Sequence, residues 1–397
     1  MQLTTRFLPL FLLALPFLWT SCSDDETVIP GEFIITENID DDRILEDRVD
    51  NPNQPDYVID GDITVYGELS IEPGVVIEFE ANSSLIIEVE GSIVADGTTS
   101  KPIVMTGVAK TPGFWKGVLV YSPKITNVLH NVTISYAGGA AVSDIWFDIK
   151  ANLAVDAYSP AKISLTNCTF SHSAGLGVAI DENAIIQAFS NNTFSDNADA
   201  AMRCDAVAIA ELDGGSSFTG SNGFNGVEIV KTFVDEQTDL TWPALKDAAP
   251  YRVLGDIELR SGVYVQEGAI FQFDPVRMLI VEVAGFFNAI GTASKPIVFT
   301  GSVTSAPSWK GILFFSPSIL NKMDHCEVAF AGSDPINDIW LDFKTNIGLD
   351  DYADAKLELT NSIIRNGDGC GVYVDGGATL TQSGNTFSNL AAGDICP

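Results

Sequence analysis

The chain is poor in basic residues, in histidine and in long apolar runs. It has 21 Lys and Arg against 53 Asp and Glu, which gives a formal net charge of −32. Like-charge repulsion disfavours nucleic acid and anionic lipid as partners, so we expect partners that are neutral, cationic or bridged by cations. The 3 histidines have no metal-ligand spacing and the 6 cysteines form no C-x-x-C pair. We therefore expect neither a metal site nor a cofactor.

The cysteines also signal no disulfide framework, because their number beyond Cys22 is odd. As shown below, the chain contains two similar halves. In this comparison Cys168 matches Ser362, and Cys326 matches Val132. Positions that accept small or apolar side chains favour buried free thiols.

The N-terminus carries an apolar run from Phe7 to Trp19 that is too short to span a bilayer, and no later run is long enough. The run follows Arg6 and leads into Thr20-Ser21-Cys22. This pattern is similar to a bacterial lipoprotein signal. The resemblance implies that residues 1–21 are removed and that Cys22 is lipidated, so that acyl chains alone attach the protein to a membrane.

The segment after Cys22 is acidic and contains Pro and Asn, and we interpret residues 22–56 as a tether. Its first residues, Ser23-Asp24-Asp25-Glu26, resemble the surface-export signal of Bacteroidota lipoproteins. The resemblance implies an outer-membrane protein anchored by lipid at the cell surface. The alternative is an ordinary linker of a lipoprotein that faces the periplasm.

The rest of the chain contains an internal sequence duplication. Trp115-Lys116-Gly117-Val118-Leu119 returns as Trp309-Lys310-Gly311-Ile312-Leu313, a shift of 194 residues. The same shift relates Lys101-Pro102-Ile103-Val104 to Lys295-Pro296-Ile297-Val298. A register held without slippage indicates a duplicated structural unit, with residues 57–240 as the first half and 241–397 as the second.

A shorter period lies within each half. Phe170 and Phe194 occur in similar strings 24 residues apart, and Ile134 occupies the same place in an earlier string. Val328, Ile364 and Phe387 are their counterparts, and we predict that both sets are stacked core residues. Coils of about two dozen residues, made of short strands and turned by Gly and Asn, are typical of a parallel β-helix.

This pattern predicts an all-β fold, a right-handed parallel β-helix whose two halves stack along one axis. About eight coils per half, each rising about 4.8 Å, would put matching features on the order of 40 Å apart. The alternative is two separate solenoids hinged near Thr241-Trp242-Pro243.

Several strings carry a family resemblance. They include Tyr57 to Ile63, Ile71 to Phe79, and Lys101 to Gly107, with matches at Tyr251 to Ile257 and Lys295 to Gly301. They look like the right-handed β-helix repeat lipoproteins of Bacteroidota, which have a pectin-lyase-like fold. The resemblance covers about residues 57–397 and implies the fold without implying one activity.

Most residues shared by the halves have structural interpretations. Gly74 and Gly268 can turn with positive φ, and the prolines at 102 and 296 can open a strand where no ladder donor is needed. Trp115 and Trp309 can cover apolar strand edges with a large buried area.

The strongest candidate ligand site is the string Asp144-Ile145-Trp146-Phe147-Asp148 and its match Asp338-Ile339-Trp340-Leu341-Asp342. In a strand, Asp144, Trp146 and Asp148 would point outward together, as would Asp338, Trp340 and Asp342. An outward indole can stack on a pyranose ring while the carboxylates accept hydroxyl hydrogens. The alternative is that the indoles lie under surface loops and the carboxylates only keep an edge soluble.

The functional hypothesis is a surface-anchored lipoprotein that binds extended polysaccharide or another extracellular ligand. A polysaccharide lyase or glycoside hydrolase of pectin-lyase-like fold is the alternative, on fold analogy alone. A lyase needs a basic residue beside a cation, and a hydrolase needs a carboxylate pair. Basic residues are sparse here, so we assign no catalytic residue and favour binding over catalysis.

Overall fold

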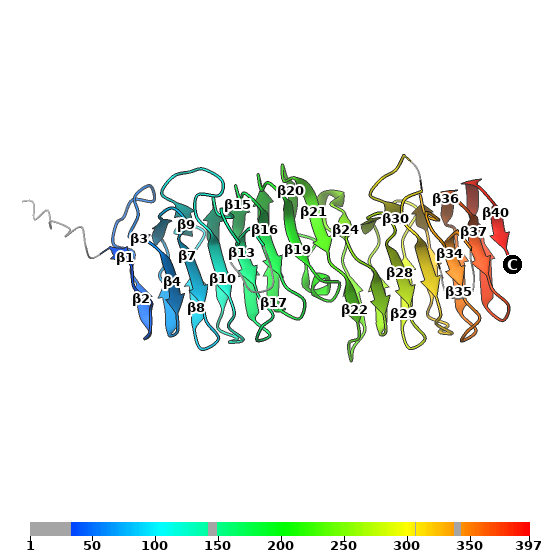
Figure 1. The fold of residues 1–397 in the computed structure, drawn as a ribbon, viewed down its shortest axis with the longest axis horizontal. Helices are drawn as coiled ribbons and strands as arrows, with labels where there is room; N and C mark the ends of the chain where they lie inside the picture. The colour runs from blue at the N-terminus through cyan, green and yellow to red at the C-terminus, as the bar shows by residue number, and fades with distance from the viewer. Residues whose placement is uncertain (1–32, 142–148, 306, 337–342) are drawn as a thin grey trace, which may run out of the picture. The chain divides into compact units, whose positions relative to one another are not determined.

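Strands of two to six residues follow one another along almost the whole chain, separated by turns rich in Gly, Asn and Asp. The computed structural model describes residues 33–141, 149–305, 307–336 and 343–397. Every pairing between named strands in the described part is parallel and joins one coil to the next, so the chain from residue 33 onward is a parallel β-helix (Figure 1).

The described strands form five sheets, named S1 to S5 here. Sheet S1 contains β1 (Ile34–Ile35), β3 (Tyr57–Ile59), β6 (Val76–Phe79), β9 (Ile103–Gly107), β12 (Val132–Ser135), β15 (Thr169–Ser171), β18 (Thr193–Ser195) and β20 (Ser217–Gly220). Sheet S3 contains β2 (Arg43–Leu45), β5 (Glu68–Ile71), β8 (Ser92–Asp96), β11 (Val128–His130), β14 (Lys162–Thr166) and β17 (Ile185–Ser190).

Sheet S2 is the longest. It contains β4 (Asp62–Val65), β7 (Ser84–Ile87), β10 (Gly117–Val120), β13 (Ala151–Val155), β16 (Leu176–Ile180), β19 (Ala200–Cys204), β21 (Phe224–Ile229), β24 (Tyr251–Val253), β27 (Ile270–Phe273), β30 (Ile297–Gly301), β33 (Cys326–Ala329), β36 (Ile363–Gly367) and β39 (Thr386–Leu390). It therefore runs through both halves of the repeat.

The other two sheets belong to the second half. Sheet S4 contains β22 (Thr232–Val234), β25 (Ile257–Leu259), β28 (Met278–Val281), β31 (Gly311–Phe314), β34 (Thr345–Leu349), β37 (Cys370–Val374) and β40 (Gly393–Cys396). Sheet S5 contains β23 (Leu240–Trp242), β26 (Gly262–Val265), β29 (Phe286–Ile290), β32 (Lys322–Asp324), β35 (Lys356–Thr360) and β38 (Thr379–Ser383). Two short 3-10 helices, η1 (Ala208–Glu211) and η2 (Lys246–Ala248), lie on either side of the junction between the halves.

Sheet S2 also shows how the halves are joined. β21 pairs with β24 in register, Val227 opposite Tyr251. At the 194-residue shift β24 matches β3. In the first half β3 belongs to sheet S1, whereas in the second half its match β24 belongs to sheet S2. The pairing confirms one continuous stack and contradicts the hinged alternative near residue 242.

Strand pairing confirms the predicted core residues. Ile134 pairs with Phe170, and Phe170 with Phe194. In the second half, Val328 pairs with Ile364, and Ile364 with Phe387. The 36-residue step from 134 to 170 is therefore one coil with an inserted loop.

The inserted loops make the predicted coil number wrong. Seven successive pairings lead from β4 to β24 in sheet S2, so about seven coils separate matching features instead of eight. At about 4.8 Å per coil the axial separation is roughly 34 Å.

The predicted structural roles of the shared residues are also confirmed. Trp115 and Trp309 are fully buried, and each indole N–H donates to a backbone carbonyl oxygen, of Ser135 and Ala329 respectively, at 2.8 Å. Gly74 and Gly268 have φ of +100° and +86°. Strands β9 and β30 begin one residue after the prolines at 102 and 296.

Buried amides form a ladder inside the first half. Asn152 donates to Asn197 at 3.3 Å, and Asn197 donates to Asn222 at 2.8 Å, so the ladder extends from the coil of β13 to that of β21. All three side chains are buried, so each amide on the ladder replaces the hydrogen bonds that water would have provided.

The predicted tether, residues 22–56, is wrong from residue 33 onward, because this part belongs to the β-helix. β1 and β2 pair with β3 and β5, and Ile35, Ile39 and Leu45 are buried. The buried Asp56 carboxylate accepts backbone N–H groups from residues 48, 49 and 76. The sequence did not predict these strands because the segment has too few apolar residues to show a hydrophobic periodicity. The three buried residues nevertheless cover the N-terminal end of the core.

Candidate functional site

The residues predicted to bind ligand lie outside the described residues. These are Asp144, Trp146, Asp148, Asp338, Trp340 and Asp342, and the lipidation candidate Cys22 lies outside as well. The described chain on either side shows where each string is inserted. The first lies between β12 and β13, and the second lies between β33 and β34.

Small apolar clusters lie outside the main core, on or next to β13 and β34, the strands that follow these insertions. Leu119, Ala154 and Ala179 form a buried cluster separate from the main core, and half-buried Ile149 packs against it. In the second half Met278, Leu313 and Ile336 form a similar cluster, with Phe343 against it. Each half therefore has a small apolar layer outside the coil.

A turn at the end of these strands presents a tyrosine to solvent in each half. Tyr158 is 80% exposed and Tyr352 is 81% exposed. Each turn is held by a carboxylate two residues earlier, because Asp156 accepts the Tyr158 N–H and Asp350 accepts the Tyr352 N–H, both at 2.7 Å. This is an Asx turn, which fixes the backbone below the ring.

The carboxylate on the next coil lies beside each tyrosine turn. Asp181 accepts the N–H of Ala157 at 3.3 Å, and burial raises the pKa of Asp181 to about 6. Asp375 is its match at the 194-residue shift. Burial, and then repulsion from Asp351 and Asp350, raise the pKa of Asp375 above its ordinary value.

Exposed aliphatic side chains occur at the corresponding corner of the preceding coil. Ile125 is 69% exposed and its match Ile319 is 78% exposed. The two coils are tied together in the first half, where the Ser159 hydroxyl donates to the carbonyl of Tyr121 at 3.1 Å. Each half thus has an exposed isoleucine on one coil and, on the next coil, an exposed tyrosine close to two carboxylates.

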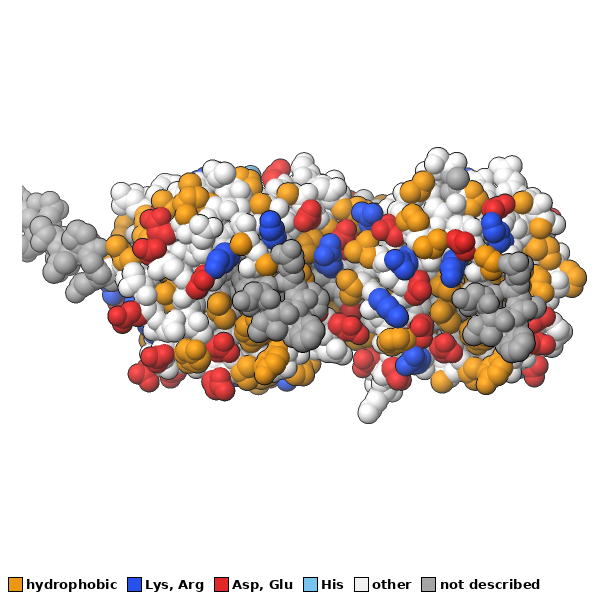
Figure 2. Space-filling view, in the orientation of Figure 1, with side chains coloured by type: hydrophobic (Ala, Val, Ile, Leu, Met, Phe, Trp, Pro, Cys, Tyr) orange, Lys and Arg blue, Asp and Glu red, His pale blue; other side chains and the backbone are white. Residues whose placement is uncertain are grey.

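Basic side chains lie at the other end of the same strands. Lys116 pairs with Asp62 at 2.6 Å, and Lys344 pairs with Asp368 at 2.9 Å. Figure 2 shows Lys and Arg side chains gathered across the middle of the visible face, with carboxylates between them. A chain of ion pairs at the junction of the halves joins Arg203, Glu228, Arg252 and Asp274.

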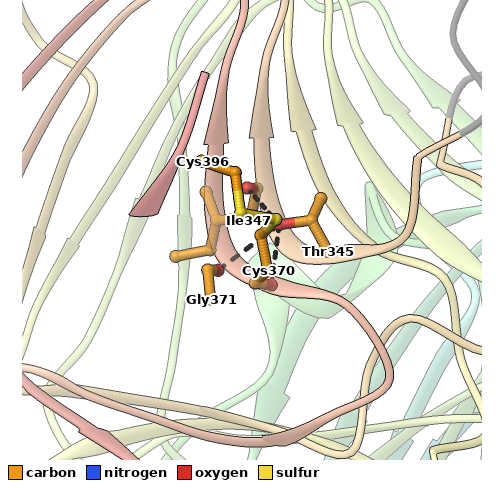
Figure 3. Close-up of a disulfide and its surroundings, with 5 residues drawn as sticks. All are labelled: Thr345, Ile347, Cys370, Gly371 and Cys396. Carbon is orange, nitrogen blue, oxygen red and sulfur yellow. Dashed lines mark hydrogen bonds between the residues drawn. A yellow bond between two sulfur atoms is a disulfide. The ribbon is translucent and has the colours of Figure 1, made fainter. Parts of the chain in front are cut away.

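The cysteines include a disulfide that the sequence analysis missed. Cys370 is bonded to Cys396, and Figure 3 shows the pair beside Thr345, whose hydroxyl lies 2.9 Å from the carbonyl oxygen of Ile347. The two cysteines are 26 residues apart, close to one coil, and this spacing was the available signal. Cys168, Cys204 and Cys326 are buried free thiols, as predicted for 168 and 326.

Two other kinds of site are absent from the described ranges. No group of three or more His, Cys, Asp or Glu side chains there is placed to hold a metal ion. No helix in that part of the chain is long and apolar enough to cross a membrane.

Comparison with known proteins supports the fold. Residues 44–148 match the family model of the pectate-lyase like beta helix domain. The crystal structure of an alginate lyase from Paenibacillus sp. str. FPU-7 is a distant match, with 12% identity and a TM-score of 0.21 over 91% of this chain and 99% of that chain. A likeness this distant says nothing of what the present chain does. No curated protein sequence matches.

Proposed function

We propose that this protein is a lipid-anchored surface protein whose β-helix binds an extended polysaccharide. The observation that carries the proposal is the pair of exposed tyrosine turns, at Tyr158 and Tyr352, in matching places of the two halves. An exposed ring held on a fixed turn loses little conformational freedom when a sugar stacks on it. The neighbouring carboxylates can accept hydrogens from sugar hydroxyls.

The separation of the two turns suits a polymer. Seven coils at about 4.8 Å place them roughly 34 Å apart along the axis. A chain that has bound one turn meets the other at high effective concentration, so two weak contacts can together hold it firmly. In this proposal Trp146 and Trp340, with their flanking aspartates, remain candidates for further sugar contacts.

The test is polysaccharide binding by variants of the full chain. Tyr158→Ala and Tyr352→Ala should each weaken binding several-fold, the usual effect of losing one aromatic contact, and the double variant should lose most of it. Trp146→Ala and Trp340→Ala form a parallel set. Tyr66→Ala is the control, because Tyr66 is also exposed but follows β4, three strands of sheet S2 before β13, and its match in the second half is Arg260. Wild-type binding by the folded Tyr double variant would refute the proposal.

The anchor is a separate part of the proposal. Cys22→Ala should release the protein from the outer-membrane fraction, and mass spectrometry of the wild type should find acyl chains on Cys22. The Cys370–Cys396 disulfide supports export, because disulfides persist in oxidising compartments. Wild-type protein without lipid would refute the anchor and leave the binding proposal intact.

A polysaccharide lyase or glycoside hydrolase is the second candidate. The match of residues 44–148 to the pectate-lyase like beta helix domain favours it. Incubation with each bound polysaccharide and analysis of the products separates the two. Shortened chains, with or without a new double bond, would establish catalysis.

A further inference from the structure

Two cations at the start of sheet S4 differ from the other basic residues of this face. Arg277 precedes β28 and Lys310 precedes β31, and the Lys310 N–H donates to the Arg277 carbonyl at 2.8 Å. The two residues therefore lie in register on adjacent coils, about 4.8 Å apart. Among the described residues neither has a carboxylate partner, and the enclosed Nε of Arg277 has no hydrogen-bond partner.

The first half shows what is unusual here. Its matching residues are Ser83 and Lys116, and Lys116 pairs with Asp62 at 2.6 Å. The second half keeps the aspartate as Asp256, but that carboxylate accepts the Met278 N–H at 3.2 Å. The second half therefore has an additional cation, Arg277 in place of Ser83. Its matching carboxylate, Asp256, accepts a backbone N–H and does not pair with the lysine.

Neighbouring cations on this face are neutralised within the protein. Arg203 pairs with Glu228 at 2.6 Å and Arg252 pairs with Asp274 at 2.8 Å. Arg277 and Lys310 instead place two like charges on adjacent coils, with no carboxylate partner among the described residues. An oxyanion that reaches both would relieve the repulsion and accept charge-assisted hydrogen bonds.

The net charge of −32 does not prevent an anion from binding at this place. Exposed charges are largely screened beyond about 8 Å at physiological ionic strength, so distant carboxylates contribute little. Two carboxylates lie near the pair: Asp256 accepts the Met278 N–H, and Asp274 is neutralised by Arg252, so an excess of positive charge remains at this place. An anion site here would be an exception to the composition-based expectation of neutral, cationic or cation-bridged partners.

We propose that Arg277 and Lys310 bind a carboxylate or sulfate group carried by the polysaccharide, an inference that rests on the proposed function. The planar guanidinium suits either oxyanion, because its donors are arranged as a fork. The site lies in the second half only, so an acidic polymer would be held by the tyrosine turns of both halves and by one anion contact.

The experiment compares three polymers on the full chain: a polyuronate, a sulfated polysaccharide and a neutral polysaccharide. The variants are Arg277→Ser, which introduces the residue of the first half, and Lys310→Ala. Lys322→Ala is the matched control, because Lys322 is a lysine of sheet S5 paired with Glu358 at 2.8 Å. Affinity is measured at low and at physiological salt.

Each site variant should weaken binding of an acidic polymer about tenfold, the loss expected for one charge-assisted hydrogen bond, and should reduce its salt dependence. Neutral-polymer binding and the Lys322 control should not change. A preference of the wild type for the polyuronate assigns a carboxylate, and a preference for the sulfated polymer assigns a sulfate.

Unchanged acidic-polymer binding in both site variants would overturn the anion site, as would an equal loss of neutral-polymer binding. The Tyr158→Ala/Tyr352→Ala double variant separates this result from failure of the proposed function. If that variant loses all polymers while the charge variants lose none, only the anion site is wrong. If no polymer binds the wild type, the proposed function fails.

Discussion

In the first half of the solenoid Trp115 stacks on Phe79 with ring centroids 3.8 Å apart, and in the second half Trp309 stacks on Phe273 at 4.2 Å. The same coils differ on the outside. Ser84, whose hydroxyl donates to Asp62, is replaced by Met278, and the ion pair formed by Lys116 has no equivalent at position 310.

The difference separates two kinds of constraint. A closely packed interior responds to every change of volume, so the buried indole and its ring partner are the same in both halves. The outer face meets solvent, and a changed side chain there has a small energetic effect. Function can therefore diverge on the outer face while the coil beneath stays the same.

The largest expected effect tests the equivalence of the two interiors. Trp115→Ala and Trp309→Ala should each destabilise their half by about 3–5 kcal/mol, because each leaves a large cavity and a buried carbonyl without its donor. Hydrogen exchange resolved by coil is the suitable measurement, since a solenoid need not unfold in one step. A loss confined to one of the two variants would show that the halves are not equivalent.

The disulfide should break the symmetry between the halves. The first half has Leu176 at the position that matches Cys370, so only the second half is cross-linked there. Replacing Cys370 and Cys396 by Ala should cost about 3 kcal/mol, the loop-entropy value for a closure of this length. Faster amide exchange should appear in β38 to β40 and not in the first half. Equal exchange with and without the bond would contradict this.

The carboxylates beside the tyrosine turns give a smaller, pH-dependent effect. The pKa of Asp181 is about 6, above its ordinary value of 3.8, because of burial. Its folded form binds the proton more tightly, so this group's contribution to stability is lost as pH rises from about 4 through 6. The pKa of Asp375 is raised in the same direction.

Asp351 distinguishes these two carboxylates, because its match in the first half is Ala157. Asp351→Ala should lower the pKa of Asp375 and leave that of Asp181 at about 6. Carboxyl chemical shifts followed by NMR during a pH titration measure both groups. Movement of both pKa values, or of neither, would contradict the stated cause.

The smallest effect concerns the lysines of the outer face. Lys116→Ala should cost less than about 1 kcal/mol of stability, the range for an exposed ion pair, and Lys310→Ala should cost nothing measurable. Thermal unfolding with Lys322→Ala alongside gives the comparison. A larger loss for the Lys310 variant would show a role in folding that the described contacts do not include.

The fold followed from sequence because its constraints repeat. Phe170 and Phe194, 24 residues apart, define one coil, and a 194-residue register without slippage locates the second half. The N-terminal coil was missed because Ile35, Ile39 and Leu45 form no period that a window could detect. The disulfide was missed because pairing of Cys370 with Cys396 depends on which residues meet on adjacent coils.

The candidate site was only partly predictable. Tyr158 and Tyr352 match at the 194-residue shift, but their exposure depends on a turn geometry that sequence similarity does not specify. The lone cations were not predicted at all. Lys310 matches Lys116 in sequence, and only the direction taken by the Asp256 carboxylate shows that one lysine is paired and the other is not.

The disulfide between Cys370 and Cys396 has a mechanical consequence. Hydrogen bonds between coils run along the solenoid axis, so tension applied along that axis would open a terminal coil one bond at a time. Tension applied beyond Cys396 meets a covalent bond first and passes directly into β37, bypassing the weaker pairing of β40. The C-terminal coil would thus resist peeling from the stack when the chain is pulled at that end.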